Sequence, residues 1–165
     1  MKTSLLKICL LFVCAFLFSA DTRSQQVTVY DSFAQLESRL KSPGDTILVV
    51  NFWATWCKPC VQELPYFQSL EKKSAAGKKI KILLVSLDFK VQLDSLVMPF
   101  IKNKNVTQEV VLLADSDEND WISKIATEWD GAIPATLLIS GSKRLFHGEA
   151  FQSEAELEQW VESAY

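Results

Sequence analysis

The sequence predicts an α/β fold with a central mixed sheet and helices on both faces of the sheet. Strand-like and helix-like segments alternate along the chain, and this alternation is typical of parallel strands joined by crossing helices. A continuous apolar run at residues 47–53, broken only by Asn51, indicates a strand buried on both faces. Gly141-Ser142 lies between two short strand-like segments and predicts a closing hairpin, which adds an antiparallel strand.

The expected strands are short runs rich in apolar and β-branched residues, bounded by residues that favour turns. Two of them, at 47–53 and 80–87, are apolar enough to predict burial on both faces of the sheet. The full set of expected strands lies at residues 27–30, 47–53, 80–87, 109–113, 135–140 and 143–147.

The expected helices are recognised by their apolar spacing and by residues that begin or end helices. Asp31 is the expected N-cap of the first, and Pro65 is expected to kink the second, which runs from Cys57 to Ala76 before Gly77. The last is opened by the capping-box pattern Ser153-Glu154-Ala155-Glu156. The expected helices lie at 31–41, 57–76, 94–104, around 121–125, and after 153.

Length and composition favour one packed domain. The chain has 165 residues, of which 48% are hydrophobic and 22% charged, and these values exclude a disordered or fibrous protein. The net charge of −3 provides too little positive charge for binding that depends on phosphate neutralisation. We therefore expect no nucleic-acid partner, and we expect a monomer.

The N-terminal residues 1–24 have the layout of a secretory signal peptide. Lys2 and Lys7 precede an apolar stretch at 8–18, which is followed by small residues. The cleavage site stays open, and so do an uncleaved N-terminal membrane anchor and a lipid on Cys14. The domain at 25–165 is expected to be exported to the periplasm or cell envelope of a bacterium.

Removal of the signal peptide leaves two cysteines, Cys57 and Cys60, in the exported domain. Cys57 lies where a buried strand ends and a helix begins, and the free N–H groups of a helix start favour a thiolate. Lys58 adds a nearby cation, and Pro59 fits the first helical turn because its missing N–H is not needed there. Cysteines three residues apart on a helix are close enough to form a disulfide. The pattern predicts a reactive dithiol.

The segment VVNFWATWCKPCVQELP resembles the active-site strand, turn and helix of thioredoxins. Pro65 matches that family's helix proline, and Ile133-Pro134 resembles its cis-proline loop, so the resemblance covers most of residues 44–165. Asn51 replaces the buried Asp of cytoplasmic thioredoxins, and Glu63 matches the Glu of exported reductases of the TlpA and ResA type. The helix and strand expected between Leu87 and Leu113 resemble the insertion of that subgroup.

The resemblance implies a thioredoxin-like fold and a thiol-disulfide oxidoreductase that reduces disulfides of exported proteins. It implies that Cys57 attacks the substrate disulfide and that Cys60 resolves the mixed disulfide. The two cysteines then alternate between a reduced dithiol and an oxidised Cys57–Cys60 disulfide. Glu63 is expected to accept the Cys60 proton, although a surface Glu near a helix start is an equal alternative. A membrane protein is the expected electron donor, and cytochrome c maturation is one candidate pathway.

The resemblance also implies roles for residues around the two cysteines. Trp56 is expected on the exposed rim that receives substrate, with the Ile133 backbone pairing with an extended substrate segment and a cis Pro134 lying against Cys57. Asn51, Lys58 and Pro59 are the residues expected to tune the redox pair. The other tryptophans and the single histidine, His147, are expected to be structural.

Three other functions stay open on the sequence alone. A disulfide-forming oxidase or isomerase would use the same two cysteines, and Lys58 favours that direction. A metal-binding module or a redox-silent peptide-binding module would use the same fold. Two thiolates rarely complete a tetrahedral metal site, so we expect neither a metal nor a cofactor.

Overall fold

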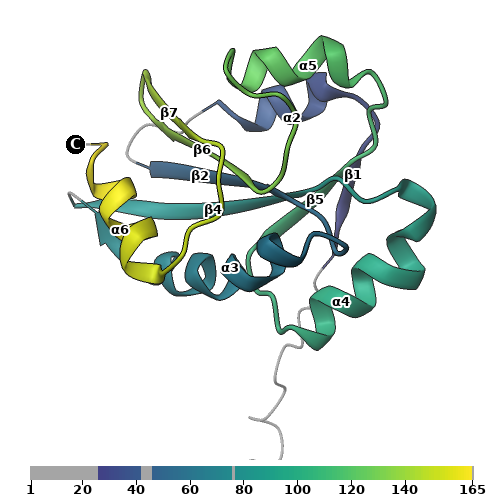
Figure 1. Ribbon diagram of the computed structural model, residues 1–165, viewed down its shortest axis with the longest axis horizontal. Coiled ribbons are helices and arrows are strands. Elements are labelled where there is room, and N and C mark those ends of the chain that lie inside the picture. The colour runs from purple at the N-terminus through teal and green to yellow at the C-terminus, as the bar shows by residue number, and fades with distance from the viewer. Residues whose placement is uncertain (1–25, 42–45, 76, 165) are drawn as a thin grey trace, which may run out of the picture.

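The computed structural model describes residues 26–41, 46–75 and 77–164, so the predicted signal peptide lies outside the described residues. These residues form a seven-stranded sheet with helices on both faces (Figure 1). The strands are β1 (Thr28–Tyr30), β2 (Thr46–Trp53), β3 (Ser74–Ala75), β4 (Lys78–Ser86), β5 (Glu109–Leu113), β6 (Ala135–Ser140) and β7 (Lys143–His147).

The sheet has the order β1-β5-β4-β2-β6-β7, and β3 pairs with β4 outside this path. The neighbours β1, β5, β4 and β2 run parallel, while β6 is antiparallel to β2 and β7 is antiparallel to β6. The predicted mixed sheet is therefore confirmed. Strand β2 pairs with β4 on one side and with β6 on the other. The C-terminal ends of β2 and β4 and the N-terminal end of β6 therefore lie side by side, next to the residues that follow β2.

The helical segments form two layers, one on each face of the sheet (Figure 1). The layer drawn below the sheet contains α3 (Lys58–Leu70), α4 (Met98–Asn103) and α6 (Glu154–Glu162). The layer above it contains α2 (Phe33–Arg39) and α5 (Glu118–Ile125). A 3-10 turn, η1 (Lys90–Gln92), and a π-helical turn, η2 (Leu93–Val97), lead from β4 into α4.

Each layer encloses its own apolar core, and side chains of β2 alternate between the two. Val49 and Trp53 pack with Leu64 and Phe67 of α3 in one core. In the other, Phe52 lies against the ring of Trp129, with the ring centroids 4.7 Å apart. Burying both faces of β2 in this way explains why its sequence is a nearly continuous apolar run. The described residues contain no helix that is both long and apolar enough to span a bilayer.

Two local predictions are wrong in detail. The first helix is capped by Ser32 instead of Asp31, and the Gln35 side chain accepts hydrogen bonds from both backbone N–H groups. Helix α3 continues through Pro65 but ends at Leu70 instead of Ala76. The sequence after Lys72 has no large apolar residue that a further helical turn could bury, and the chain instead pairs with β4 through β3.

Candidate active site

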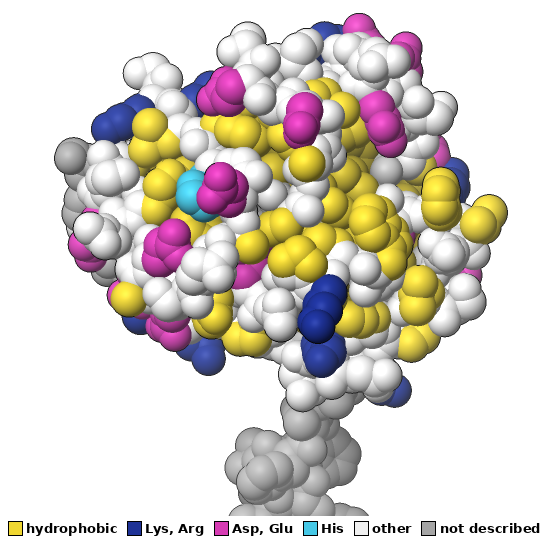
Figure 2. Space-filling view, in the orientation of Figure 1, with side chains coloured by type: hydrophobic (Ala, Val, Ile, Leu, Met, Phe, Trp, Pro, Cys, Tyr) yellow, Lys and Arg dark blue, Asp and Glu magenta, His cyan; other side chains and the backbone are white. Residues whose placement is uncertain are grey.

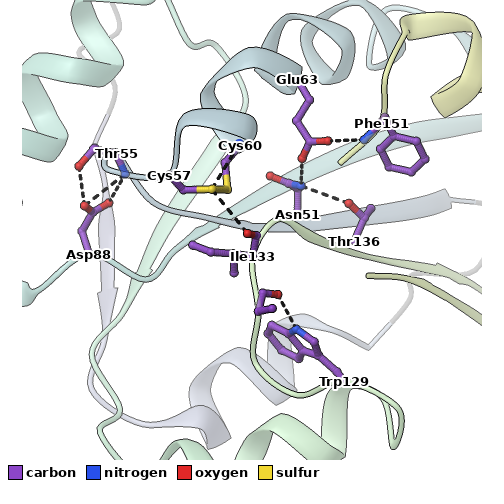
Figure 3. The surroundings of a disulfide bond; sticks show 11 residues. Asn51, Thr55, Cys57, Cys60, Glu63, Asp88, Trp129, Ile133, Thr136 and Phe151 are labelled. Atoms are coloured by element: carbon purple, nitrogen blue, oxygen red, sulfur yellow. Dashed lines mark hydrogen bonds between the residues drawn. A yellow bond between two sulfur atoms is a disulfide. The ribbon is translucent and has the colours of Figure 1, made fainter. Parts of the chain in front are cut away.

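The two cysteines lie at the start of α3, directly after the turn that follows β2 (Figure 3). They form a disulfide with Cα atoms 5.3 Å apart. Cys57 is the N-cap of α3, and its sulfur accepts a hydrogen bond of 3.3 Å from the Cys60 backbone N–H. When the bond is reduced, this N–H and the positive end of the helix stabilise a Cys57 thiolate.

The two sulfurs differ in their access to solvent. Cys57 is 5% exposed and Cys60 is fully buried, while Lys58 and Pro59 between them are exposed. Trp56, just before the pair, is 63% exposed. An incoming molecule can therefore reach Cys57 before it can reach Cys60.

The loop before β6 faces Cys57 across the site (Figure 3). The Ile133–Pro134 peptide bond is cis, and the carbonyl oxygen of Ile133 lies 3.7 Å from the Cys57 sulfur. Trp129 holds the loop by donating a 2.8 Å hydrogen bond from Nε1 to the carbonyl oxygen of Ala132. Pro134, the last residue of the loop, is buried.

A buried polar network lies below α3. Asn51 Nδ2 donates to Glu63 Oε1 at 2.9 Å and to Thr136 Oγ1 at 3.1 Å, and the Phe151 N–H donates to Glu63 Oε2 at 2.9 Å. Burial raises the pKa of Glu63 to about 7, against the lowering effect of the bonds from Phe151 and Asn51. At neutral pH this carboxyl group therefore exists in both protonation states.

A second polar cluster fixes the turn that carries the cysteines. The Asp88 carboxylate, just after β4, accepts hydrogen bonds from the backbone N–H and the hydroxyl group of Thr55, the latter at 2.6 Å. Ser86 donates to the same carboxylate at 2.8 Å. Asp88 was not predicted from its sequence pattern, although an Asp that follows a buried parallel strand lies at the same sheet edge as the end of β2.

Comparison with known proteins identifies the family. The model of the AhpC/TSA family matches residues 25–146. The chain belongs to the AhpC/TSA family. Its relatives include thiol-disulfide oxidoreductase ResA of Bacillus cereus, which is 29% identical over 126 residues, covering 74% of this chain and 64% of ResA. The chain spans between 21% and 64% of the length of the curated relatives that it matches.

Solved structures show the same fold as this AhpC/TSA family member. StoA from Bacillus subtilis aligns with a TM-score of 0.51 and 25% identity over 72% of this chain and 84% of StoA. A thioredoxin-related protein from Neisseria meningitidis aligns with a TM-score of 0.60 and 21% identity, covering 75% of this chain and 87% of the other. The predicted thioredoxin-like fold and the resemblance to the TlpA and ResA type are confirmed.

In this AhpC/TSA family member the structure brings most of the predicted site residues together. Cys57, Cys60 and Ile133 meet at the disulfide, and the disulfide lies over the strand that carries Asn51 (Figure 3). Glu63 is 1% exposed, so the alternative of a surface Glu is wrong. Its carboxylate accepts hydrogen bonds from Asn51 and Phe151. Among the described residues, no hydrogen bond joins Glu63 to Cys60.

His147 lies nearer to the site than the sequence suggested. It is the register partner of Thr136, and its ring stacks on Phe151 with centroids 4.2 Å apart. Phe151 in turn donates its N–H to Glu63. No sequence signal pointed to Phe151 or Thr136, because each contributes a backbone or hydroxyl group that only the packing of β6 and the chain after β7 places there.

Proposed function

We propose that the protein is a thiol-disulfide oxidoreductase that reduces disulfides of exported proteins. The observation that carries this proposal is the unequal pair at the start of α3: one sulfur caps the helix and reaches the surface, and the other is enclosed. This is the arrangement that a nucleophile and a resolving thiol require.

In the first step, the Cys57 thiolate of the reduced protein attacks one sulfur of the substrate disulfide. A new bond joins Cys57 to that sulfur, the substrate S–S bond breaks, and the other substrate sulfur leaves as a thiolate. The Ile133 carbonyl oxygen, beside Cys57, is available to accept a backbone N–H of an extended substrate segment.

In the second step, the Cys60 thiolate attacks the Cys57 sulfur and releases the second substrate thiolate. The substrate gains two electrons, and the protein loses two as the Cys57–Cys60 bond forms. Cys60 must first lose its proton in a buried site. Glu63 lies one turn farther along α3, and its pKa of about 7 suits a group that takes up this proton near neutral pH.

The relatives support the activity and the location. ResA and the sporulation protein of Bacillus subtilis are named thiol-disulfide oxidoreductases, and a secreted Mycobacterium tuberculosis homologue has a related structure. With the signal-like residues 1–24, these names support export to the cell envelope. We further propose a membrane dithiol protein as electron donor and cytochrome c maturation as the pathway served.

Trapping of the mixed disulfide tests the reaction. The purified protein is reduced and mixed with a disulfide-bonded protein, and covalent adducts are separated on non-reducing gels. The Cys60→Ser variant is expected to accumulate an adduct, because it can attack but not resolve. The Cys57→Ser variant is the matched control and is expected to form none. Adducts that depend on Cys60 instead of Cys57 would contradict the assigned roles.

The direction of electron flow is tested by the redox potential. A value near −270 mV, measured against glutathione, supports a reductant, whereas a value near −120 mV supports a disulfide-forming oxidase. The oxidase is the second candidate because Lys58 and the Cys60 N–H both favour a Cys57 thiolate, and stabilising the thiolate makes the pair more oxidising.

A further inference from the structure

The large hydrophobic side chains that are exposed among the described residues gather beside the redox pair. Trp56 is 63% exposed, Phe89 72%, Val91 90% and Leu96 38%. Trp56 adjoins Cys57, and the other three lie on the segment that leads from β4 through η1 and η2. Hydrophobic side chains cover this part of the face in Figure 2, over the start of α3 and the chain after β4. We call these four residues the apolar platform.

The two parts of the apolar platform are fixed side by side. Thr55 precedes Trp56, Asp88 precedes Phe89, and the Asp88 carboxylate holds both the backbone N–H and the hydroxyl group of Thr55. Lys90, between Phe89 and Val91, is paired with Asp31 at 2.5 Å. Lys58 and Asp94, which lie close to platform residues in the sequence, are exposed charged residues.

The exposed apolar side chains between Asp88 and Val97 are not needed by the core. Leu93 and Val97 face inward and pack with the layer of α3 and α4, whereas Phe89 and Val91 extend into solvent. Such exposed apolar side chains contribute little burial to folding, and their clustering is typical of an interaction surface.

The size of the platform fits a transient partner. Its four side chains offer on the order of 500 Å² of exposed apolar surface, since one aromatic side chain alone carries about 150–250 Å². A stable dimer needs roughly 800 Å² from each partner, whereas redox encounters are smaller. The area therefore argues against a permanent second copy of this chain.

We propose that the apolar platform binds the hydrophobic residues that flank a cystine in an incompletely folded substrate. This inference rests on the proposed function. Folded proteins bury most of their large apolar side chains, so such residues beside an accessible disulfide mark a chain that has not finished folding. Binding of these flanking residues by Phe89 and Val91 brings the substrate disulfide to Cys57 and selects non-native over native cystines.

A binding experiment tests the platform without any redox chemistry. The oxidised protein is titrated with two cysteine-free peptides of equal length and charge, one rich in Phe, Leu and Val and the other with Ser and Asn in their place. The apolar peptide is expected to bind roughly tenfold more tightly. The double variant Phe89→Ser/Val91→Ser is expected to abolish this preference, and Phe89→Leu/Val91→Ile is expected to keep it. Equal binding of both peptides by the unaltered protein would overturn the proposal.

A kinetic experiment then compares two cystine peptides with the same apolar and polar flanks. The reduced protein is expected to reduce the apolar peptide roughly tenfold faster, and Phe89→Ser/Val91→Ser is expected to remove the difference by slowing reduction of the apolar peptide. A ratio that survives in the double variant overturns the platform. Failure to reduce either peptide contradicts the proposed function, and the titration still decides the platform. Concentration-dependent dimers that Phe89→Ser/Val91→Ser abolishes would assign the platform to self-association and also overturn it.

Discussion

The side-chain amide of Asn51 donates a 2.9 Å hydrogen bond to the carboxylate of Glu63, and both side chains are enclosed by the protein. The Asn51 Oδ1 atom, also buried, has no hydrogen-bond partner among the residues that the structure describes. In Figure 3 this oxygen points away from Glu63 and Thr136. A neutral amide in this position leaves Glu63 as the titrating group of the network, which distinguishes the site from one built on a buried Asp.

Replacing Glu63 with Gln is expected to slow resolution of the mixed disulfide without slowing the attack by Cys57. A general base contributes about 10²–10⁴ to a rate, so a loss of that order is expected for Cys60. Stopped-flow measurement of the two steps across pH 5–9 separates them. The unaltered protein is expected to show a step in the resolution rate near pH 7, from the Glu63 pKa of about 7. The exposed Glu162→Gln is the matched control, and a Glu63→Gln variant that keeps the step near pH 7 would exclude Glu63 as the proton acceptor.

Glu63 is also expected to make stability depend on pH. Its pKa is about 7 in the folded protein and about 4.5 in the unfolded chain, so the folded state binds the proton more tightly. This contribution is fully present below pH 4.5 and is lost as pH rises through 7, with a magnitude on the order of 3 kcal/mol. Urea unfolding of the oxidised protein from pH 4 to 8.5 measures it. The same curve for Glu63→Gln is expected to lack this decline, and parallel curves for the two proteins would contradict the assignment.

The Thr55 hydroxyl is expected to contribute to the position of the redox pair. Thr55→Val removes its 2.6 Å bond to the buried Asp88 carboxylate, and loss of a hydrogen bond to a charged group costs about 1.5–3 kcal/mol. Thr55→Ser retains the hydroxyl group and is the matched control. Urea unfolding gives the free energy, and the rate of mixed-disulfide formation reports any shift of Cys57. Equal stability of the Val and Ser variants would show that the backbone N–H bond alone holds the turn.

Two buried tryptophans provide a test of the loop opposite Cys57. Trp129→Phe removes the bond from Nε1 to the Ala132 carbonyl oxygen, whereas Trp121→Phe removes a buried Nε1 that has no hydrogen-bond partner in the described part of the chain. The first change is expected to destabilise the protein by about 1–3 kcal/mol more than the second. Hydrogen exchange of the amides at 130–133 is expected to accelerate only in Trp129→Phe. Similar exchange in both variants would assign the loop's order to ring packing alone.

Local patterns predict the strands better than they predict the helix ends. The strands at 109–113, 135–140 and 143–147 have the predicted bounds, because their apolar runs end at clear turn residues. The end of α3 depends on β3, which forms only when the chain returns to β4. The end of α3 is therefore set by the pairing of two segments, and the local spacing of apolar residues cannot predict it.

The residues of the candidate site were likewise easiest to predict where they lie close together in the sequence. Cys57, Cys60 and Glu63 lie on one stretch of chain, so their spacing alone placed them together. Thr136 and Phe151 come from other segments and were missed, because the packing that brings them to Asn51 and Glu63 is visible only in the folded protein. Asp88 was also missed, although its place after a buried strand was a usable signal. The roles predicted for Cys57, Cys60 and Glu63 are tested by the variants described above.

The pairing of β2 with both β4 and β6 has a consequence for electron transfer. The cysteines, the Asp88 carboxylate and the Ile133 carbonyl oxygen are all attached to the ends of these three hydrogen-bonded strands. Making or breaking the sulfur–sulfur bond therefore requires rotation of the cysteine side chains, while the backbone of the three strands does not move. The oxidised and reduced forms are expected to have superimposable backbones, so little reorganisation energy accompanies each two-electron exchange.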